Sequence, residues 1–162
     1  IYGLTKGQSS PTSDIGMITT STPYGKIEVP VSPLNHYLTA GVSYIASYYS
    51  SKPKILAKFI KEAMDHRGFS IVHVQSPCTT YNDTYDLLKG KPREGIPGLA
   101  WDIPDDHDPN NLESALNLIQ KPGIPLGLIY KMEGKTLEDR QQEIRNKVSE
   151  KTVETTLSEY LI

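Results

Sequence analysis

Residues 1–8, which read IYGLTKGQ, contain residue types that bind anions. Gly3 and Gly7 bracket Thr5 and Lys6, so backbone, hydroxyl and ammonium groups are available within one short turn. Glycines let the backbone approach an anion closely, and a lysine ammonium forms charge-assisted hydrogen bonds with phosphate or carboxylate oxygens. The glycine spacing differs from that of a Walker loop. The segment is therefore either an anion site or an ordinary turn with an exposed lysine.

The single cysteine, Cys78, lies in a second such segment, which reads SPCTTYND over residues 76–83. A free cysteine is most often a small buried hydrophobe. Its alternatives are a nucleophile or one ligand of a metal or cluster, and His73, five residues away, gives a nucleophile no local support. One cysteine excludes an internal disulfide and an all-cysteine zinc site. The residues alone therefore favour the structural role.

The remaining polar candidates are weaker. The histidines follow no ligand spacing, and four aspartates gather in one loop, namely Asp102, Asp105, Asp106 and Asp108. A cation site there is an alternative to a solvated turn, which is the commoner outcome.

Length and charge limit the class of protein. The chain has 162 residues, the size of one domain or of part of a larger one. Its net charge of −2 argues against general nucleic-acid binding, and its apolar runs are too short to span a membrane. Because Ile1 opens the chain inside a strand-like stretch, we expect a fragment or a processed subunit.

The clearest structural pattern is a strand, helix and strand over residues 42–49, 53–66 and 69–76. The helix carries one apolar stripe, formed by Ile55, Leu56, Phe59, Ile60, Ala63 and Met64. This order predicts a right-handed βαβ unit with an interior second strand, and a helix that packs on the sheet and buries Phe59 there. The expected fold class is α/β, a parallel sheet flanked by helices. Ligands bind at the carboxyl ends of parallel strands, where both candidate segments would lie.

Further elements follow from local signals. A helix is expected from Pro33, a short one over residues 85–88, and another that begins at Asp108-Pro109. Residues 124–132 indicate a strand. Residues 9–33, rich in Ser, Thr, Pro and Gly, predict a long loop that is functional or disordered.

The division of the chain follows from its charge. Residues 1–132 form the expected domain, and residues 133–162 a charged tail. The tail carries a thin apolar stripe of Ile144, Val148, Val153, Leu157 and Leu161. We expect it to be helical and to lie on a partner surface or to fray.

Several strings together resemble one family. IYGLTKGQSSPTS at 1–13, STPYG at 21–25, HRGFS at 66–70 and SPCTTYND at 76–83 are similar to the thiamine-diphosphate-binding β subunit of the 2-oxoacid:ferredoxin oxidoreductases. The resemblance covers about residues 1–90, the rest matching in general character, and is greatest to archaeal two-subunit enzymes. It implies part of a thiamine-diphosphate-binding fold in a cytoplasmic enzyme.

The resemblance also implies an activity and a site. Family members decarboxylate pyruvate or other 2-oxoacids oxidatively, giving acyl-CoA and CO₂ and reducing ferredoxin. Thiamine diphosphate would lie against Gly3, Leu4 and Thr5, and the catalytic Lys6 near the substrate carboxylate or the diphosphate. The backbone oxygen of Ile1 would be a ligand of Mg²⁺.

Under the same resemblance, Cys78 is the fourth ligand of a [4Fe-4S] cluster. The three other cysteines and the GDGD motif of the family are absent from the sequence, so we expect the isolated chain to be inactive. The implied partners are an α or fused γα subunit, the remaining N-terminal part of the β subunit, ferredoxin, coenzyme A and a 2-oxoacid, with no nucleic acid and no membrane. A non-redox thiamine decarboxylase and a non-catalytic, partner-binding remnant are the alternatives.

Overall fold

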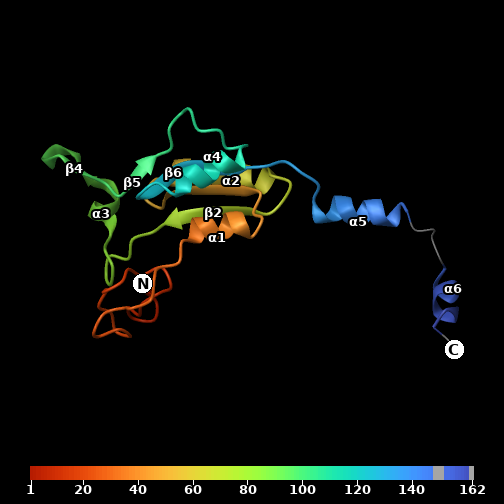
Figure 1. Cartoon of the computed structure of the whole chain (residues 1–162), viewed down its shortest axis with the longest axis horizontal. Coiled ribbons are helices and arrows are strands. Elements are labelled where there is room, and N and C mark those ends of the chain that lie inside the picture. The colour runs from red at the N-terminus through yellow and green to blue at the C-terminus, as the bar shows by residue number, and fades with distance from the viewer. Residues whose placement is uncertain (148–151, 161–162) are drawn as a thin grey trace.

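The computed structural model describes residues 1–147 and 152–160. A four-stranded sheet lies at its centre (Figure 1), in the order β2 (Ser70–Gln75), β1 (Tyr44–Tyr49), β6 (Ile124–Lys131) and β5 (Ala100–Asp102). The pairs β1–β2 and β5–β6 are parallel, whereas β1 and β6 are antiparallel. The α/β class with flanking helices is confirmed, but the sheet is mixed rather than wholly parallel.

The predicted βαβ unit is present. Helix α2 (Pro53–Asp65) joins β1 to β2, with Pro53 at its first turn. Strand β1 is buried on both faces, as its apolar sequence predicts. Strand β2 is an edge strand of the described sheet and only partly buried, so the expectation of an interior strand is wrong for this part of the chain.

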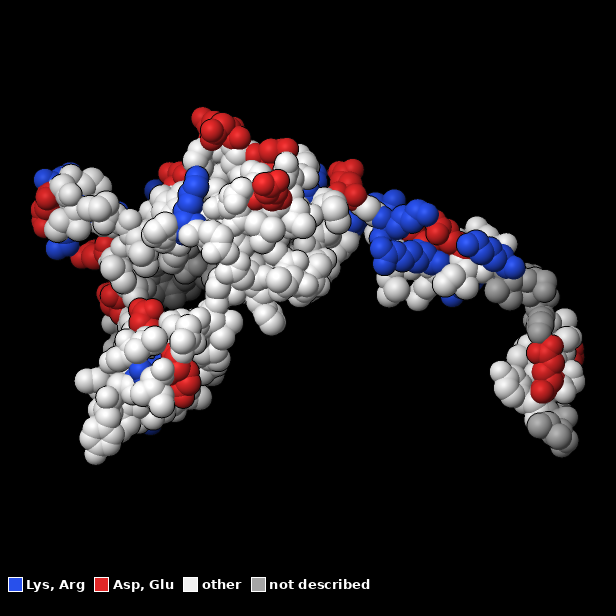
Figure 2. Space-filling model, viewed as in Figure 1, with Lys and Arg blue, Asp and Glu red and all other residues white. Residues whose placement is uncertain are grey.

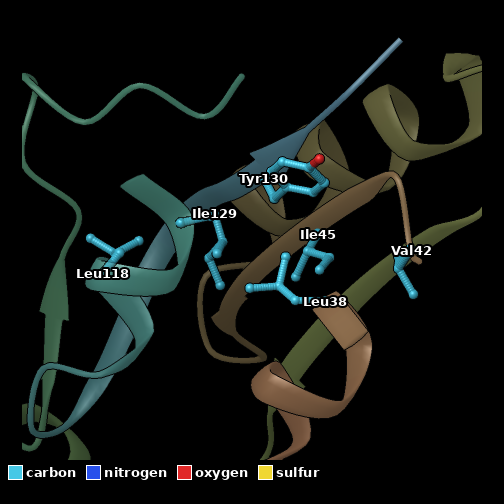
Figure 3. Close-up of a cluster of buried hydrophobic side chains, with 7 residues drawn as sticks. Leu38, Val42, Ile45, Leu118, Ile129 and Tyr130 are labelled. Atoms are coloured by element: carbon cyan, nitrogen blue, oxygen red, sulfur yellow. The ribbon is translucent and has the colours of Figure 1, made fainter. Parts of the chain in front are cut away.

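Helices cover the two faces of the sheet differently. Helix α1 (Pro33–Thr39) and helix α4 (Leu112–Ile119) contact each other and enclose the main core on one face. Figure 3 shows this core, which contains Leu38, Val42, Ile45, Ala115, Leu118, Ile129 and Tyr130. Helix α2 lies against the opposite face, where it contacts β1 and β2.

A buried tyrosine holds α2 to the sheet. Tyr44 Oη donates to Glu62 Oε2 at 3.0 Å and to the carbonyl oxygen of Phe59 at 3.4 Å. Burial, with a further contribution from Glu62, raises the pKa of Tyr44 above its usual value. The ring of Phe59 is partly buried and packs against Tyr48, so the expected burial of this ring is confirmed in part. The apolar stripe of α2 is wider than the surface that the sheet covers, so Met64, at one side of the stripe, remains 80% exposed.

The helix expected from Asp108 begins three residues later. Asn111 is its N-cap, and its Oδ1 accepts from the backbone N–H groups of Glu113 and Ser114 at 2.8 and 3.2 Å. Asp108 instead closes a turn by accepting from the N–H of Asn110 at 3.0 Å. Two nearby residues with N-cap preference compete here, and the one that satisfies two free N–H groups sets the boundary.

A short hairpin projects from one end of the sheet (Figure 1). It follows the expected short helix, α3 (Tyr85–Lys89), and consists of β3 (Gly90–Lys91), the 3₁₀ turn η1 (Pro92–Glu94) and β4 (Ile96–Pro97).

The C-terminal segment leaves the sheet. Helix α5 (Leu137–Arg145) starts with a capping box between Thr136 and Asp139, and α6 (Val153–Ser158) follows. Asp139 also pairs with Arg67 at 2.7 Å, which anchors the start of α5 to the end of α2. The stripe residues Ile144, Val153 and Leu157 are exposed, and Val148 and Leu161 lie outside the described residues. The domain boundary at 132 and the partner surface remain predictions.

None of the helices in the described ranges is long and apolar enough to cross a membrane.

Two isoleucines test this account of the core. Ile45 is fully buried, so Ile45→Ala should lower the free energy of unfolding by about 2–5 kcal/mol, measured by denaturant titration. Ile60→Ala makes the same change at a site 42% exposed and should cost clearly less. Equal losses would contradict the assignment of the core to the α1/α4 face.

Candidate functional site

Residues 2–8, called here the glycine loop, form a closed turn. The N–H of Tyr2 donates to the carbonyl of Gln8 at 2.9 Å, and the N–H of Gly7 donates to the carbonyl of Tyr2 at 2.8 Å. Lys6 adopts a left-handed conformation with φ of 75°, fixed by a bond from its N–H to the carbonyl of Gly3 at 3.1 Å. The strand expected at this end is reduced to a single bridge. Backbone hydrogen bonds nonetheless close the loop.

Residues 78–82, called the cysteine loop, follow β2 at the carboxyl end of the sheet. Cys78 and Asn82 exchange backbone hydrogen bonds of 3.2 and 2.9 Å across it. Within the loop, the N–H groups of Tyr81 and Thr80 hydrogen bond to the Cys78 sulfur and hold the pKa of the thiol below its usual value. The loop therefore favours a thiolate at Cys78, the form that binds metals.

The two loops touch at two glycines. A Cβ on Gly3 would lie 3.0 Å from Cys78 Sγ, and a Cβ on Gly7 would lie 3.1 Å from Cδ1 of Tyr81. Gly7 also has a φ of 90°, which residues other than glycine rarely adopt. The two segments therefore meet, and the absence of side chains on the glycines permits the close approach.

The remaining predicted site residues lie around this contact. Ile1 and Gly7 line a hollow together with Met17, Thr19 and Tyr81.

Three of the predicted site residues, Leu4, Thr5 and Lys6, are exposed. Leu4 is 99% exposed, and Lys6 is exposed beside it. Thr5 hydrogen bonds to the side chain of Gln8 within the loop. This chain therefore leaves Leu4 and Lys6 uncovered, and their roles toward a cofactor remain predictions.

The long loop over residues 9–33 is built from hydrogen-bonded turns. The N–H of Ser10 donates to Ser13 Oγ at 2.9 Å, and the N–H of Thr20 donates to the carbonyl of Gly7 at 3.2 Å, which joins this loop to the glycine loop. Its surface is largely uncharged, as the lobe near the N-terminus in Figure 2 shows, and it exposes Ile15, Ile18, Tyr24, Ile27 and Val29. An exposed apolar surface of this kind indicates a protein contact.

The other titratable candidates have structural partners. His107 donates from Nε2 to the carbonyl of Ile129 at 2.8 Å and accepts at Nδ1 from Ser114 Oγ at 3.0 Å. His73 contacts Tyr37 Oη at 3.2 Å, and burial lowers its pKa. Within residues 1–147 and 152–160, no group of three or more His, Cys, Asp or Glu side chains is placed to hold a metal ion. Asp105, Asp106 and Asp108 are exposed, Asp102 ends β5, and Cys78 has no fellow ligands in those ranges.

Comparisons with known proteins agree with this geometry. Residues 99–146 match the family that describes the C-terminal part of the pyruvate ferredoxin oxidoreductase beta subunit. The chain is 39% identical, over 82% of its own length and 46% of the relative's, to a 2-oxoacid:ferredoxin oxidoreductase subunit beta of Saccharolobus solfataricus. It is 34% identical to subunit beta of 2-oxoacid:ferredoxin oxidoreductase 1 of Aeropyrum pernix, over 80% of its own length and 43% of the relative's.

A solved structure gives the same result. The 2-oxoglutarate:ferredoxin oxidoreductase from Magnetococcus marinus, with 2-oxoglutarate, coenzyme A and succinyl-CoA bound, is 39% identical. The likeness has a TM-score of 0.85 and covers 100% of this chain and 55% of that one. The chain thus spans about half the length of the relatives it matches.

Fold and sequence together define a β-subunit protein of the ferredoxin-dependent oxidoreductases. The chain belongs to the family of 2-oxoacid:ferredoxin oxidoreductase β subunits, and a β subunit implies further subunits. The family match at residues 99–146 lies in the part where the sequence resembled the family only in general character.

The cysteine loop predicts an unusual pH dependence of thiol chemistry. In the chain without a cluster, the rate of Cys78 alkylation by iodoacetamide should reach half its maximum at a lower pH than for a free cysteine peptide. The reason is that the N–H donors of Tyr81 and Thr80 stabilise the thiolate, which is the reactive form. Cys78 is the single cysteine, so total labelling by mass spectrometry measures it directly. A midpoint at or above that of the peptide would contradict the assigned hydrogen bonds.

Proposed function

We propose that this chain is part of the β subunit of an enzyme that decarboxylates a 2-oxoacid oxidatively. The contact between the glycine loop and the cysteine loop carries the proposal, because it joins a candidate cofactor loop to a candidate electron acceptor. The relative from Magnetococcus marinus, solved with 2-oxoglutarate, coenzyme A and succinyl-CoA bound, supports the substrate class.

Oxidation of one 2-oxoacid releases two electrons, and two ferredoxins take up one electron each. One 2-oxoacid, one coenzyme A thiol and two oxidised ferredoxins give acyl-CoA, CO₂, two reduced ferredoxins and a proton. Bound thiamine diphosphate supplies the stabilisation of the carbanion that decarboxylation leaves, and the protein orients the reactants. A cluster would suit this reaction, because it carries single electrons and ferredoxin accepts them one at a time.

Residues of the glycine loop would form one wall of the cofactor site. Gly3 presents bare backbone toward Cys78, and Thr5 carries a hydroxyl in the same turn. Leu4 is almost fully exposed in this chain. An apolar side chain in such a position is typical of one that packs on a cofactor or on a neighbouring protein. The carbonyl oxygen of Ile1 would be a Mg²⁺ ligand, and Lys6 would bind an anionic oxygen of the substrate or the diphosphate.

Cys78 would hold a [4Fe-4S] cluster. Its thiolate is stabilised by backbone N–H groups of the cysteine loop, a donor arrangement suited to a cluster sulfur ligand. The other three thiolates would come from outside this chain, which spans about half of its relatives. A decarboxylase without a redox step would need no thiolate at this position.

The α subunit would cover the exposed apolar surface of residues 9–33 and, in part, the tail. Ile18, Tyr24 and Ile27 are each more than two-thirds exposed, although the hydrogen-bonded loop holds them in a defined arrangement. Uncovered side chains on a preformed surface are typical of protein–protein contacts.

Substitution of the cysteine tests the redox assignment. In the full enzyme, Cys78→Ser should lose or degrade the cluster, because a hydroxyl at this position is a much poorer iron ligand than a thiolate. Iron content, visible absorbance and ferredoxin reduction should fall together, whereas thiamine diphosphate binding should survive better. Ser76→Ala, an exposed position in the same turn, is the matched control. Full iron content with normal ferredoxin reduction in Cys78→Ser would refute the assignment.

Substitution of the lysine tests the anion site. Lys6→Ala in the full enzyme should weaken the use of 2-oxoacid or thiamine diphosphate about tenfold or more, for a lost charge-assisted contact of about 1.5–3 kcal/mol. Alanine keeps a Cβ at this left-handed position, so the backbone requirement is unchanged. Lys58→Ala, on the exposed face of α2, is the control. Unchanged titrations with both ligands would remove Lys6 from the site.

A further inference from the structure

The lobe of residues 9–33, called here the N-terminal lobe, is polar inside and apolar outside. Its buried side chains are those of Ser10, Ser13 and Lys26, whereas none of its apolar side chains is buried. Folded domains normally bury apolar side chains and leave lysines in water. Hydrophobic burial within the described chain therefore does not explain the shape of this lobe.

Hydrogen bonds hold the lobe together instead. The N–H of Gly16 donates to the carbonyl of Lys26 at 2.7 Å, and the N–H of Lys26 donates to the carbonyl of Met17 at 3.0 Å. The buried ammonium of Lys26 donates to the carbonyl of Glu28 at 2.6 Å. These bonds bring residues 15–18 next to residues 24–27, and so gather exposed apolar side chains from both segments on a surface that is already formed.

The exposed charge of the lobe has a single sign. Asp14, Lys26 and Glu28 are its three charged residues, and of these only the two acids are exposed (Figure 2). Neither carboxylate has an ion pair or a side-chain hydrogen bond with any residue in the ranges 1–147 and 152–160. Asp14 is next to Ile15 in the sequence, and Glu28 follows Ile27. The lobe thus presents an apolar patch with unpaired negative charge beside it.

This charge restricts what can cover the patch. In a two-fold contact between two copies of the lobe, the same patch faces itself, so the acids of one copy would approach those of the other. Like charges that meet across an interface oppose association, whereas basic side chains opposite the acids favour it. The patch therefore suits a different protein, with Lys or Arg at the rim of an apolar surface. A β subunit implies such further subunits.

From these observations we infer that the N-terminal lobe is the docking surface for another subunit of the same enzyme, which presents an apolar patch with Lys or Arg at its rim. The inference rests on the proposed function, which supplies the α subunit as that partner, and it adds the chemistry of the contact. Tyr24, which is fully exposed, and Ile27 belong to the apolar centre, and Glu28 belongs to the charged rim.

The test measures the affinity of the full β subunit for the separately purified α subunit by calorimetric titration, at low and at high salt. Tyr24→Ala and Ile27→Ala remove apolar contacts, and Glu28→Lys reverses the charge at the rim. Ile60→Ala on α2 and Asp106→Lys in the loop before α4 are the matched controls, because both positions are exposed and lie outside the lobe. Self-association and thermal unfolding of each β variant alone are measured as well.

Tyr24→Ala and Ile27→Ala should each raise the dissociation constant about tenfold, because truncation of a large side chain at the centre of an interface has effects of this size. Glu28→Lys should raise it by a similar factor at low salt, and the difference from the wild type should shrink at high salt, since salt screens the charges at the rim. The controls should bind like the wild type. All β variants in the lobe should keep the wild-type unfolding temperature and mass when they are alone.

Wild-type affinity in both Tyr24→Ala and Ile27→Ala would overturn the inference, as would a Glu28→Lys variant that binds as tightly as the wild type at low salt. If the lobe variants lower the stability of the β subunit alone and leave the affinity unchanged, the rest of that subunit covers the lobe and the inference is wrong. If they abolish self-association instead, a second copy covers it and the inference is equally wrong.

The proposed function is tested separately in the wild-type complex. A complex that forms with normal affinity but reduces ferredoxin with no 2-oxoacid would contradict the proposed function. The affinities of the lobe variants would still decide whether the lobe is the docking surface.

Discussion

Strand β1 is the constraint on which the rest of the structure depends. It pairs with β2 along one edge and with β6 along the other, and its residues are buried on both faces. Ile45 joins the α1/α4 core, while the neighbouring Tyr44 binds α2 through Glu62 on the opposite face. A buried strand paired along both edges has little freedom in register, because a slip by one residue would exchange its two faces.

This central strand determines where the chemistry can lie. The parallel pairing of β1 and β2 sends the chain out of β2 at the carboxyl end of both strands, directly into the cysteine loop. The glycine loop reaches the same place from the N-terminus. The long loop of residues 9–33 holds it there through the hydrogen bond from the N–H of Thr20 to the carbonyl of Gly7. The two loops are thus placed by different forces, strand pairing for one and local turns for the other. Their contact at Gly3 and Gly7 joins them into one site.

The surface of the chain agrees with membership in a larger assembly. Apolar side chains remain exposed on the lobe of residues 9–33, on α2 and on the C-terminal helices. These surfaces lie on preformed turns and helices, so burying them against a partner would cost little conformational entropy. The edge position of β2 fits the same picture, since an unpaired strand edge is a natural place for further strands.

Periodicity and motif made much of this predictable from the sequence. The apolar stripe of α2 and the apolar runs on either side of it predicted the βαβ unit, because helix and strand periods are local properties. The candidate loops were likewise predictable, since glycine, threonine, lysine and cysteine carry their chemistry with them. The resemblance to a known family then turned an ambiguous cysteine into a cluster ligand candidate, which the residues alone did not favour.

Tertiary structure decided what depends on distant neighbours. The antiparallel pairing of β6, the partial burial of Phe59 and the choice of Asn111 over Asp108 as N-cap all follow from packing between segments. The contact between Tyr81 and Gly7 is the clearest case, because no local pattern in either segment predicts it. Gly7 lies more than seventy residues before Tyr81 in the chain, and only the folded structure brings those two positions together.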